Sequence, residues 1–389
     1  MAPMDLELSG LRIWDGVSDA LRPGSLFVTA GRLAERGAAE RERIDLAGAV
    51  ALPGLCDAHV HLALDPERRE AAQDGSSDSV EAMAVRARAM AAAGITTARD
   101  LGGPDFGALA LRDRIARAEV IGPRLLCAGQ PLTSPQGHCW YWGGEANGAD
   151  ELRAVVRRQV EAGADWIKVM ATGGVLTKGT TPAMSQFEQA ELDAAVAEAR
   201  AHGRHTAAHC HGTEGILRAA RAGVRTIEHC SFASESGFGA APDPEVIAEV
   251  ARAGAWVSPT VNTGFGRFFD ERGEPSKFAT RMGEVYAGLR RAGARFVAST
   301  DAGIPNVAHH RLPEALPIFA RLARLTPLET LRSATSEAAR ALDLERETGR
   351  LTPGLAADLL VVDGNPLEDL GALLRPLLVL ARGRIAYRA

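Results

Sequence analysis

Six residues of types that can hold metal ions recur along the chain, each at or near the end of a short apolar run. They are His59, His61, Lys168, His209, His229 and Asp301. Imidazole nitrogens and carboxylate oxygens are common protein ligands of divalent metals such as zinc. If the apolar runs are strands that end at one face, these side chains converge on two metal ions. Hydrolysis by metal-activated water is then the expected chemistry.

His59 and His61 lie two positions apart at the end of an apolar run. Because side chains alternate along a strand, both rings point to the same side. Two adjacent imidazoles make a poor hydrophobic core and a good metal clamp. Taken alone, the pair could equally be two hydrogen-bonded histidines without a metal.

Lys168 stands inside the apolar run 166–170. A buried lysine is rare and costly unless it is paired or neutralised. A bare ammonium group is repelled by a cation, whereas an amine carboxylated by carbon dioxide is an anion that can bridge two metals. The alternative is that the ammonium group reaches solvent at the mouth of the fold.

Two further histidines, His209 and His229, close apolar runs of their own. His211 shares the strand parity of His209 and is a rival ligand. We prefer His209 because His211 is expected in the following loop, where it is a candidate substrate contact. Asp301 ends the last run, 297–303, and can bind a metal and take a proton from bound water. His138, in a long loop, is a candidate to bind substrate and polarise its carbonyl group.

The elements that position these residues repeat along the chain. A run with helical periodicity ends in glycine, and a short apolar strand follows. The glycines are Gly94, Gly163, Gly203, Gly223, Gly254 and Gly293. Strands that alternate with helices favour an α/β fold, and eight of them predict a closed (β/α)₈ TIM barrel. An open doubly wound sheet is the alternative, but it expects a glycine-rich turn where residues 61–65 read HLALD.

The two ends of the chain lack helical periodicity and read as short strands. We expect residues 1–52 and 346–389 to form one discontinuous β-sandwich domain, because neither end is large enough to be stable alone. Residues 53–345 are then the catalytic barrel. Long loops at 65–79, 130–147 and 264–277 are expected on its catalytic face.

Composition restricts the partners of the protein. A net charge of −5 gives no basic surface for nucleic acid. We find no apolar run long enough for a membrane span and expect no signal peptide. Five cysteines, an odd number without paired spacing, indicate reduced thiols and a cytoplasmic location. We expect a small-molecule substrate, and formation of a homo-oligomer stays open.

Several motifs together resemble the amidohydrolase superfamily. They are residues 52–61 (LPGLCDAHVH), 167–174 (IKVMATGG), 209–212 (HCHG), 227–229 (IEH), 299–301 (STD) and 354–366 (GLAADLLVVDGNP). Lys168 with the following Gly-Gly, together with the His138 loop, resembles the prolidase-like branch. That branch contains two-metal peptidases acting on dipeptides or N-acyl amino acids, and amidases related to ochratoxin hydrolases.

The resemblance implies a role for each candidate residue. One metal is held by the first two histidines and the aspartate, and the other by the remaining pair. The ligand sets are His59, His61 and Asp301 for the first ion, and His209 and His229 for the second. Carboxylated Lys168 and a hydroxide bridge both ions, which we expect to be zinc. His138 matches the loop histidine that contacts the carbonyl oxygen. Some relatives carry a tyrosine shortly after the histidine of the sixth strand, where this chain has Ser231 and Phe232.

We therefore expect a metal-dependent hydrolase of amide bonds in dipeptides or N-acyl amino acids, acting through a metal-bridging hydroxide. The rival enzyme is a one-metal deaminase or cyclic-amide hydrolase of the imidazolonepropionase type. Lys168 speaks against this rival, because one metal needs no bridging ligand. A degenerate barrel that serves as an assembly scaffold is the rival without activity, and the presence of all six ligand candidates speaks against it.

Overall fold

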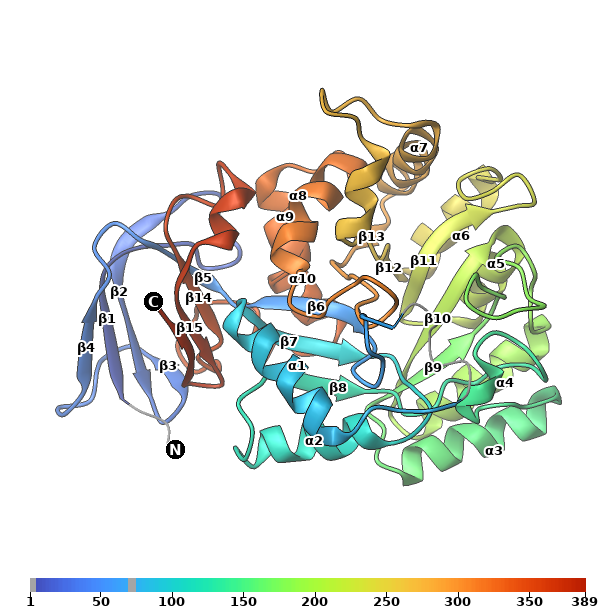
Figure 1. Cartoon of the computed structure of the whole chain (residues 1–389), viewed down its shortest axis with the longest axis horizontal. Coiled ribbons are helices and arrows are strands. Elements are labelled where there is room, and N and C mark those ends of the chain that lie inside the picture. Colours follow the sequence, from blue (N-terminus) through green and yellow to red (C-terminus); the bar gives the residue numbers. More distant parts are fainter. Residues whose placement is uncertain (1–4, 69–74) are drawn as a thin grey trace.

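The computed structural model describes residues 5–68 and 75–389. It contains an α/β unit and, beside it, a β unit that combines strands from the first and last parts of the chain (Figure 1). Parallel strands of the α/β unit form a three-stranded sheet, β6-β7-β8, and a five-stranded sheet, β13-β12-β11-β10-β9. Their bounds are β6 (Leu55–Val60), β7 (Ile95–Asp100), β8 (Arg124–Cys127), β9 (Trp166–Met170), β10 (His205–Gly212), β11 (Thr226–Ala233), β12 (Trp256–Ser258) and β13 (Arg295–Phe296). The predicted α/β class is confirmed.

Backbone hydrogen bonds connect the two parallel sheets at both edges. Between β8 and β9, the amide of Asp165 donates to the carbonyl of Cys127 at 2.8 Å. Between β6 and the segment after β13, the amide of Asp301 donates to the carbonyl of His59 at 2.9 Å. A closed barrel requires connections at both edges, since an open sheet leaves edge groups unpaired.

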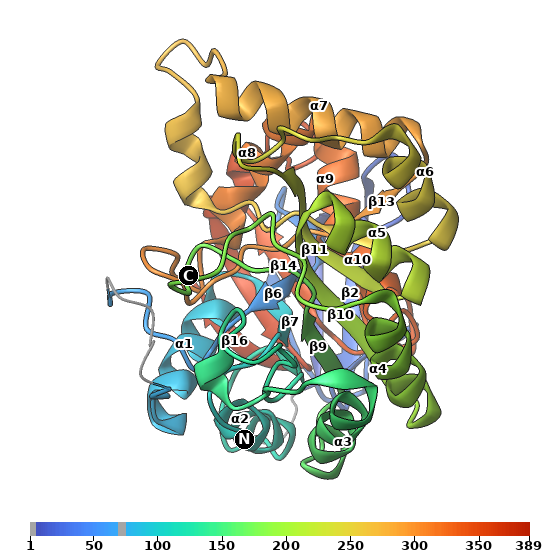
Figure 2. The same ribbon diagram turned by 90° about the vertical axis from the view of Figure 1, so that its right-hand side faces the viewer.

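Helices surround the parallel strands (Figure 2). They are α1 (Val80–Ala92), α2 (Gly107–Ala116), α3 (Gly148–Glu161), α4 (Gln189–Ala201), α5 (Thr213–Ala222), α6 (Pro244–Ala253), α7 (Lys277–Arg291), α8 (Leu312–Ala323), α9 (Pro327–Ser333) and α10 (Ser336–Ala341). Shorter 3₁₀ turns are η1 (Trp140–Trp142), η2 (Thr263–Phe268) and η3 (Leu370–Leu374). In the described part of the chain, no helix has the length and hydropathy to cross a bilayer.

Helix α6 shows how the sequence sets these boundaries. It begins after Asp243, whose side chain accepts hydrogen bonds from the amides of Glu245 and Val246. It ends at Gly254, which has a φ of +70° and so permits the left-handed turn into β12. The glycines predicted to end the other helical runs also have positive φ.

The last predicted strand is shorter than expected. We predicted a strand over 297–303, whereas β13 covers Arg295–Phe296 alone. The following residues still bond to β6, but Asp301 has a φ of 61°, which interrupts the regular ladder. Asp301 therefore lies on a turn beyond the strand and not at its end.

Both chain ends join in one eight-stranded sheet, in the order β16-β15-β14-β5-β1-β2-β3 with β4 also paired to β1. The bounds are β1 (Leu6–Ile13), β2 (Arg22–Thr29), β3 (Arg32–Ala34), β4 (Glu42–Asp45), β5 (Val50–Pro53), β14 (Leu359–Val362), β15 (Pro376–Ala381) and β16 (Arg384–Arg388). Antiparallel pairing of β5 with β14 unites the two ends. The β-sandwich description and the boundaries 1–52, 346–389 and 53–345 stay predictions.

Strand β14 separates two hydrophobic cores. Leu359 and Val361 pack into the core of the β unit. Leu360 and Val362 point to the opposite side and pack into the core shared with the α/β unit. This alternation follows from the two-residue period of a strand, and it attaches the β unit to the α/β unit through apolar contact.

Replacing Leu360 with alanine should loosen this attachment. The side chain is fully buried, so Leu360→Ala should reduce the free energy of unfolding by about 2–5 kcal/mol. Urea unfolding followed by circular dichroism measures the change. Leu374→Ala is the matched control, because Leu374 is 52% exposed and should change stability little. Equal stability of the two variants would contradict the shared core.

Candidate metal centre

The first group of candidate ligands lies where β6 meets the segment after β13. The Nε2 atoms of His59 and His61 are 3.2 Å apart. Oδ1 of Asp301 lies 3.2 Å from Nε2 of His59 and 3.3 Å from Nε2 of His61. Ligands held tetrahedrally at zinc distances of 2.0–2.1 Å are about 3.3 Å from one another, so the spacing fits such an ion.

The second group comes from β10 and β11. Nε2 of His229 lies 2.9 Å from Nδ1 of His209. Their ligand atoms and a nitrogen of His211 all lie within 4.8 Å of one another. The prediction that His211 lies in a loop is wrong, because β10 continues to Gly212 and holds this residue inside the strand. Its Nδ1 contacts Oγ of Ser231 at 2.8 Å, and its ring stacks on His229 with centroids 4.4 Å apart.

Hydrogen bonds on the far side of three rings decide which nitrogens carry protons. Nδ1 of His59 faces a carboxylate oxygen of Glu228 at 2.9 Å, and Nδ1 of His61 faces the carbonyl of Gly102 at 2.6 Å. Nε2 of His209 faces the carbonyl of Gly173 at 3.2 Å. Carbonyl and carboxylate oxygens only accept, so each of these nitrogens carries a proton. The inner nitrogens then point toward one another and toward Asp301, so that in the neutral form of each ring their lone pairs are placed to bind a cation.

Glu228 and Arg99 form a buried support that the sequence analysis missed. Nη2 of Arg99 donates to Oε1 of Glu228 at 2.9 Å, and the other carboxylate oxygen contacts His59. Both side chains have no exposed surface. Burial alone raises the pKa of Glu228, but Arg99 and His59 together hold it below its ordinary value. The signal in the sequence was a charged residue inside each of two apolar strands.

Two buried aspartates orient the chain around His59 and His61. Asp57 accepts hydrogen bonds from the amide and the hydroxyl of Thr300 at 3.1 and 2.5 Å, which ties β6 to the turn of Asp301. Asp100 accepts from the amide of Gly102 at 2.9 Å, and the carbonyl of that glycine holds His61. Burial raises the pKa of Asp57 to about 7. Neither aspartate was among the predicted site residues.

Lys168 and His138 are both buried beside these groups. Lys168, in β9, is 1% exposed, and burial lowers its pKa to about 8. The ring of His138 lies 4.6 Å from that of His209, and Nδ1 of His138 contacts the hydroxyl of Thr177 at 3.0 Å. Burial also lowers the pKa of His138, to about 4, so its ring is neutral near pH 7.

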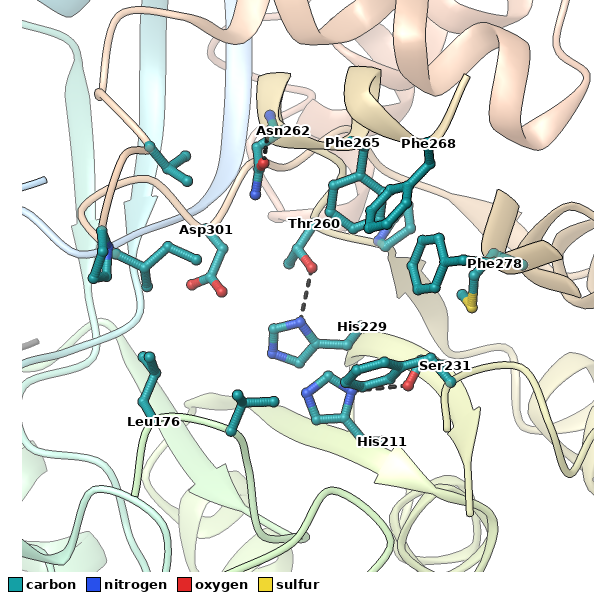
Figure 3. A pocket seen from close by; sticks show the side chains of 18 of the residues that line it. Leu176, His211, His229, Ser231, Thr260, Asn262, Phe265, Phe268, Phe278 and Asp301 are labelled. Atoms are coloured by element: carbon teal, nitrogen blue, oxygen red, sulfur yellow. Dashed lines mark hydrogen bonds between the residues drawn. The ribbon is translucent and has the colours of Figure 1, made fainter. Parts of the chain in front are cut away.

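Three of the candidate ligands, His209, His229 and Asp301, line a cavity of about 470 Å³ together with His138 and His211. Figure 3 shows Asp301 on one side of it and a group of phenylalanines on the other, with His229 and His211 between them. The loops predicted at 130–147 and 264–277 both contribute to its wall, through His138 and η2 respectively. The third predicted loop, 65–79, includes residues 69–74, which lie outside the described residues.

Backbone strain is concentrated beside this cavity. His229, Thr260 and Asp301 have φ values of 66°, 53° and 61°, although none of them is glycine. Such conformations cost about 1–3 kcal/mol each and persist where the surrounding packing imposes them. The oxygen of Thr260 in turn contacts Nδ1 of His229 at 2.7 Å. Strained backbone at His229 and Asp301 thus accompanies the placement of both side chains at the cavity.

Removing the charge of Glu228 should weaken metal binding. Glu228→Gln keeps the size of the side chain but no longer neutralises Arg99 or accepts as strongly from His59. The affinity for a divalent metal should fall about 10–100-fold, as for other partners that orient a histidine ligand. Competition with a chromogenic chelator measures the affinity, and circular dichroism checks the fold. Glu249→Gln, which removes a surface pair with Arg252, is the control. Unchanged affinity in a folded Glu228→Gln variant would show that Glu228 does not orient His59.

Comparisons with known proteins agree with this architecture. The Amidohydrolase family matches residues 50–386. The chain is 29% identical over 362 residues to an ochratoxinase of Aspergillus niger. The aligned region covers 84% of this chain and 73% of the relative. It is 28% identical over 388 residues to an imidazolonepropionase of Rhizorhabdus wittichii. The aligned region covers 90% of this chain and 88% of that relative.

A crystal structure of a Xaa-Pro dipeptidase with methionine bound in its active site superposes on this chain with a TM-score of 0.83. Identity is 28%, and 99% of this chain and 100% of that chain are covered. Prolidase-like amidohydrolases are thus among the structural neighbours. Because the family match spans most of the chain, this protein belongs to the amidohydrolase family.

Proposed function

We propose that this enzyme hydrolyses amide bonds of dipeptides or N-acyl amino acids with the help of two divalent metal ions, taken to be zinc. The observation that carries the proposal is the set of imidazole nitrogens that face one another and Asp301 beside one cavity. The outer nitrogens of His59, His61 and His209 donate hydrogen bonds to protein oxygens, so the inner nitrogens are the ones available to bind cations. Amide hydrolysis is further supported by the similarity to the ochratoxinase and the Xaa-Pro dipeptidase.

His59, His61 and Asp301 would hold one ion, and His209 and His229 the other. Lys168 would bridge both as a carboxylated lysine. Only a neutral amine reacts with carbon dioxide, and a pKa of about 8 leaves a usable neutral fraction near neutral pH. When bound, such ions supply Lewis acidity and bring the pKa of a water molecule close to neutral.

The protein's own groups would then move protons and orient the substrate. Asp301 would take a proton from the attacking water and deliver it to the leaving amine. His138 is neutral, so it would act on the substrate carbonyl as a hydrogen-bond donor and not as a charge. His211 would contact the substrate from the floor of the cavity, where Ser231 holds its ring.

Two broader expectations belong to the same proposal. We take the sheets joined at both edges as a closed (β/α)₈ barrel, and the sheet of both chain ends as a β-sandwich domain. A cytoplasmic location is supported by five free, buried cysteines, which suit a reducing compartment.

The rival function is that of a one-metal hydrolase of the imidazolonepropionase type, which the 28% identity to the Rhizorhabdus wittichii protein favours. Lys168 distinguishes the two proposals. A buried lysine is expensive, and a one-metal site has no use for a bridging anion. Metal content decides between them, because one ion per chain with full activity would favour the rival.

Lys168→Ala should lose metal and activity together. We expect about two equivalents of zinc in the wild-type protein, fewer in this variant, and partial recovery of metal and rate with acetate or propionate. Lys168→Arg should not be rescued, because arginine stays cationic and fills the space. Elemental analysis and steady-state kinetics provide the two readings, with Lys178→Ala, an exposed lysine, as the control. Wild-type metal content and rate in Lys168→Ala would eliminate the two-metal proposal.

Asp301→Asn should abolish turnover while the fold survives. The amide keeps the shape and one oxygen, but it cannot accept a proton from water. The rate constant kcat should fall by about 10²–10⁴-fold, the usual contribution of a general base. Asp193→Asn, an exposed position on α4, is the control. Substantial kcat in a folded, metal-loaded Asp301→Asn variant would assign the base to another group.

A further inference from the structure

The wall of the cavity opposite Asp301 is aromatic (Figure 3). The rings of Phe268 and Phe278 lie 4.1 Å apart, and Phe265 lies 5.9 Å from Phe268 and 5.8 Å from Phe278. Phe238 continues this surface, with its ring 6.3 Å from Phe278 and 5.1 Å from His211. We call Phe238, Phe265, Phe268 and Phe278 the aromatic wall.

Three separate segments contribute the aromatic wall: the loop after β11, η2, and the start of α7. All four rings line the cavity, and all four are only partly buried. Ordinary core packing would bury such rings, and exposed contiguous apolar surface usually marks a binding site. The wall is therefore suited to an apolar group of a ligand.

Arg267 lies at the edge of the same wall. Its guanidinium carbon is 4.7 Å from the centre of the Phe268 ring, and its side chain is exposed. Among the described residues that line the cavity, it is the only arginine or lysine. The described part of the chain offers it no ion-pair partner within 4.0 Å. A guanidinium group of this kind matches a carboxylate, which it can bind through two parallel hydrogen bonds.

We propose that the amino acid released from the substrate carries an aromatic or large aliphatic side chain and a free carboxylate. The side chain lies against the aromatic wall, and the carboxylate pairs with Arg267. Adjacent placement of Arg267 and Phe268 suits two groups of one amino acid, whose carboxylate and side chain are only a few bonds apart. Water cleaves the C–N bond, the acyl group leaves as a carboxylic acid, and the amino acid takes a proton on nitrogen. This substrate class rests on the proposed amide hydrolysis.

Three matched amides, assayed with the metal-loaded wild-type enzyme, test the two proposed interactions: the side chain with the aromatic wall and the carboxylate with Arg267. N-acetylphenylalanine has the ring and the carboxylate, N-acetylalanine lacks the ring, and N-acetylphenethylamine lacks the carboxylate. The ratio kcat/KM should be at least about tenfold higher for N-acetylphenylalanine than for either of the others, because each of the others leaves one subsite empty. Phenylalanine should also inhibit as a product more strongly than alanine.

Two pairs of variants assign the effect to residues. Phe268→Ala should lower kcat/KM for N-acetylphenylalanine about tenfold, mainly through KM, and change that for N-acetylalanine little. Phe269→Ala is its control, because the neighbouring ring packs under Arg321 and does not line the cavity. Arg267→Gln should weaken turnover of both acids but not of N-acetylphenethylamine. Arg272→Gln, an exposed arginine in the same segment outside the cavity wall, is its control.

The outcomes separate this inference from the function on which it rests. Equal kcat/KM for N-acetylphenylalanine and N-acetylalanine, with measurable hydrolysis of both, would overturn the aromatic assignment and leave the amidase proposal intact. An Arg267→Gln effect that is the same with and without the substrate carboxylate would overturn the role of Arg267. Failure of the metal-loaded protein to hydrolyse these amides and a panel of dipeptides would overturn both proposals.

Discussion

Bare ring nitrogens that face one another are the constraint on which the site depends. An acceptor holds a proton on the outer nitrogen of His59, His61 and His209, so the inner nitrogen of each neutral ring presents a lone pair to the centre of the site. Burying lone pairs that face one another is unfavourable, and a bound cation would relieve this cost. Arg99 donates a hydrogen bond to the carboxylate of Glu228 and so fixes its position. The other oxygen of that carboxylate in turn orients the ring of His59.

The fold supplies the rigidity that this constraint needs. Strands end at one face and bring candidate ligands from distant segments together, while hydrophobic packing on both sides of β14 attaches the β unit to the α/β unit. Strained backbone at His229 and Asp301 is tolerated because the surrounding core over-determines it. Positions that look unfavourable locally are thus maintained by contacts made elsewhere.

Two kinds of structural element line the cavity. Candidate metal ligands come mainly from strands, which hold them at fixed spacing, whereas the aromatic wall comes from the loop after β11, the 3₁₀ turn η2 and the start of α7. Loops on such a scaffold can vary without disturbing the strands. Chemistry and substrate preference can therefore change independently, which agrees with the different substrates in the names of the relatives.

Local sequence determined the elements and most of the candidate ligands. The common orientation of His59 and His61 follows from the strand period, and glycine at helix ends follows from backbone geometry. Both features can therefore be predicted from the sequence alone. Apolar strands at both chain ends likewise predicted their union.

Only the tertiary structure decided what stands behind and opposite those ligands. Glu228 is 169 residues from His59 and 129 from Arg99, and no local pattern specifies a contact across such a separation. His211 entered the cluster because strand pairing extended β10 further than its own residues indicate. The aromatic wall combines three segments, each too short to signal a binding surface alone. These features depend on long-range packing, which fixes them only when the whole chain has folded.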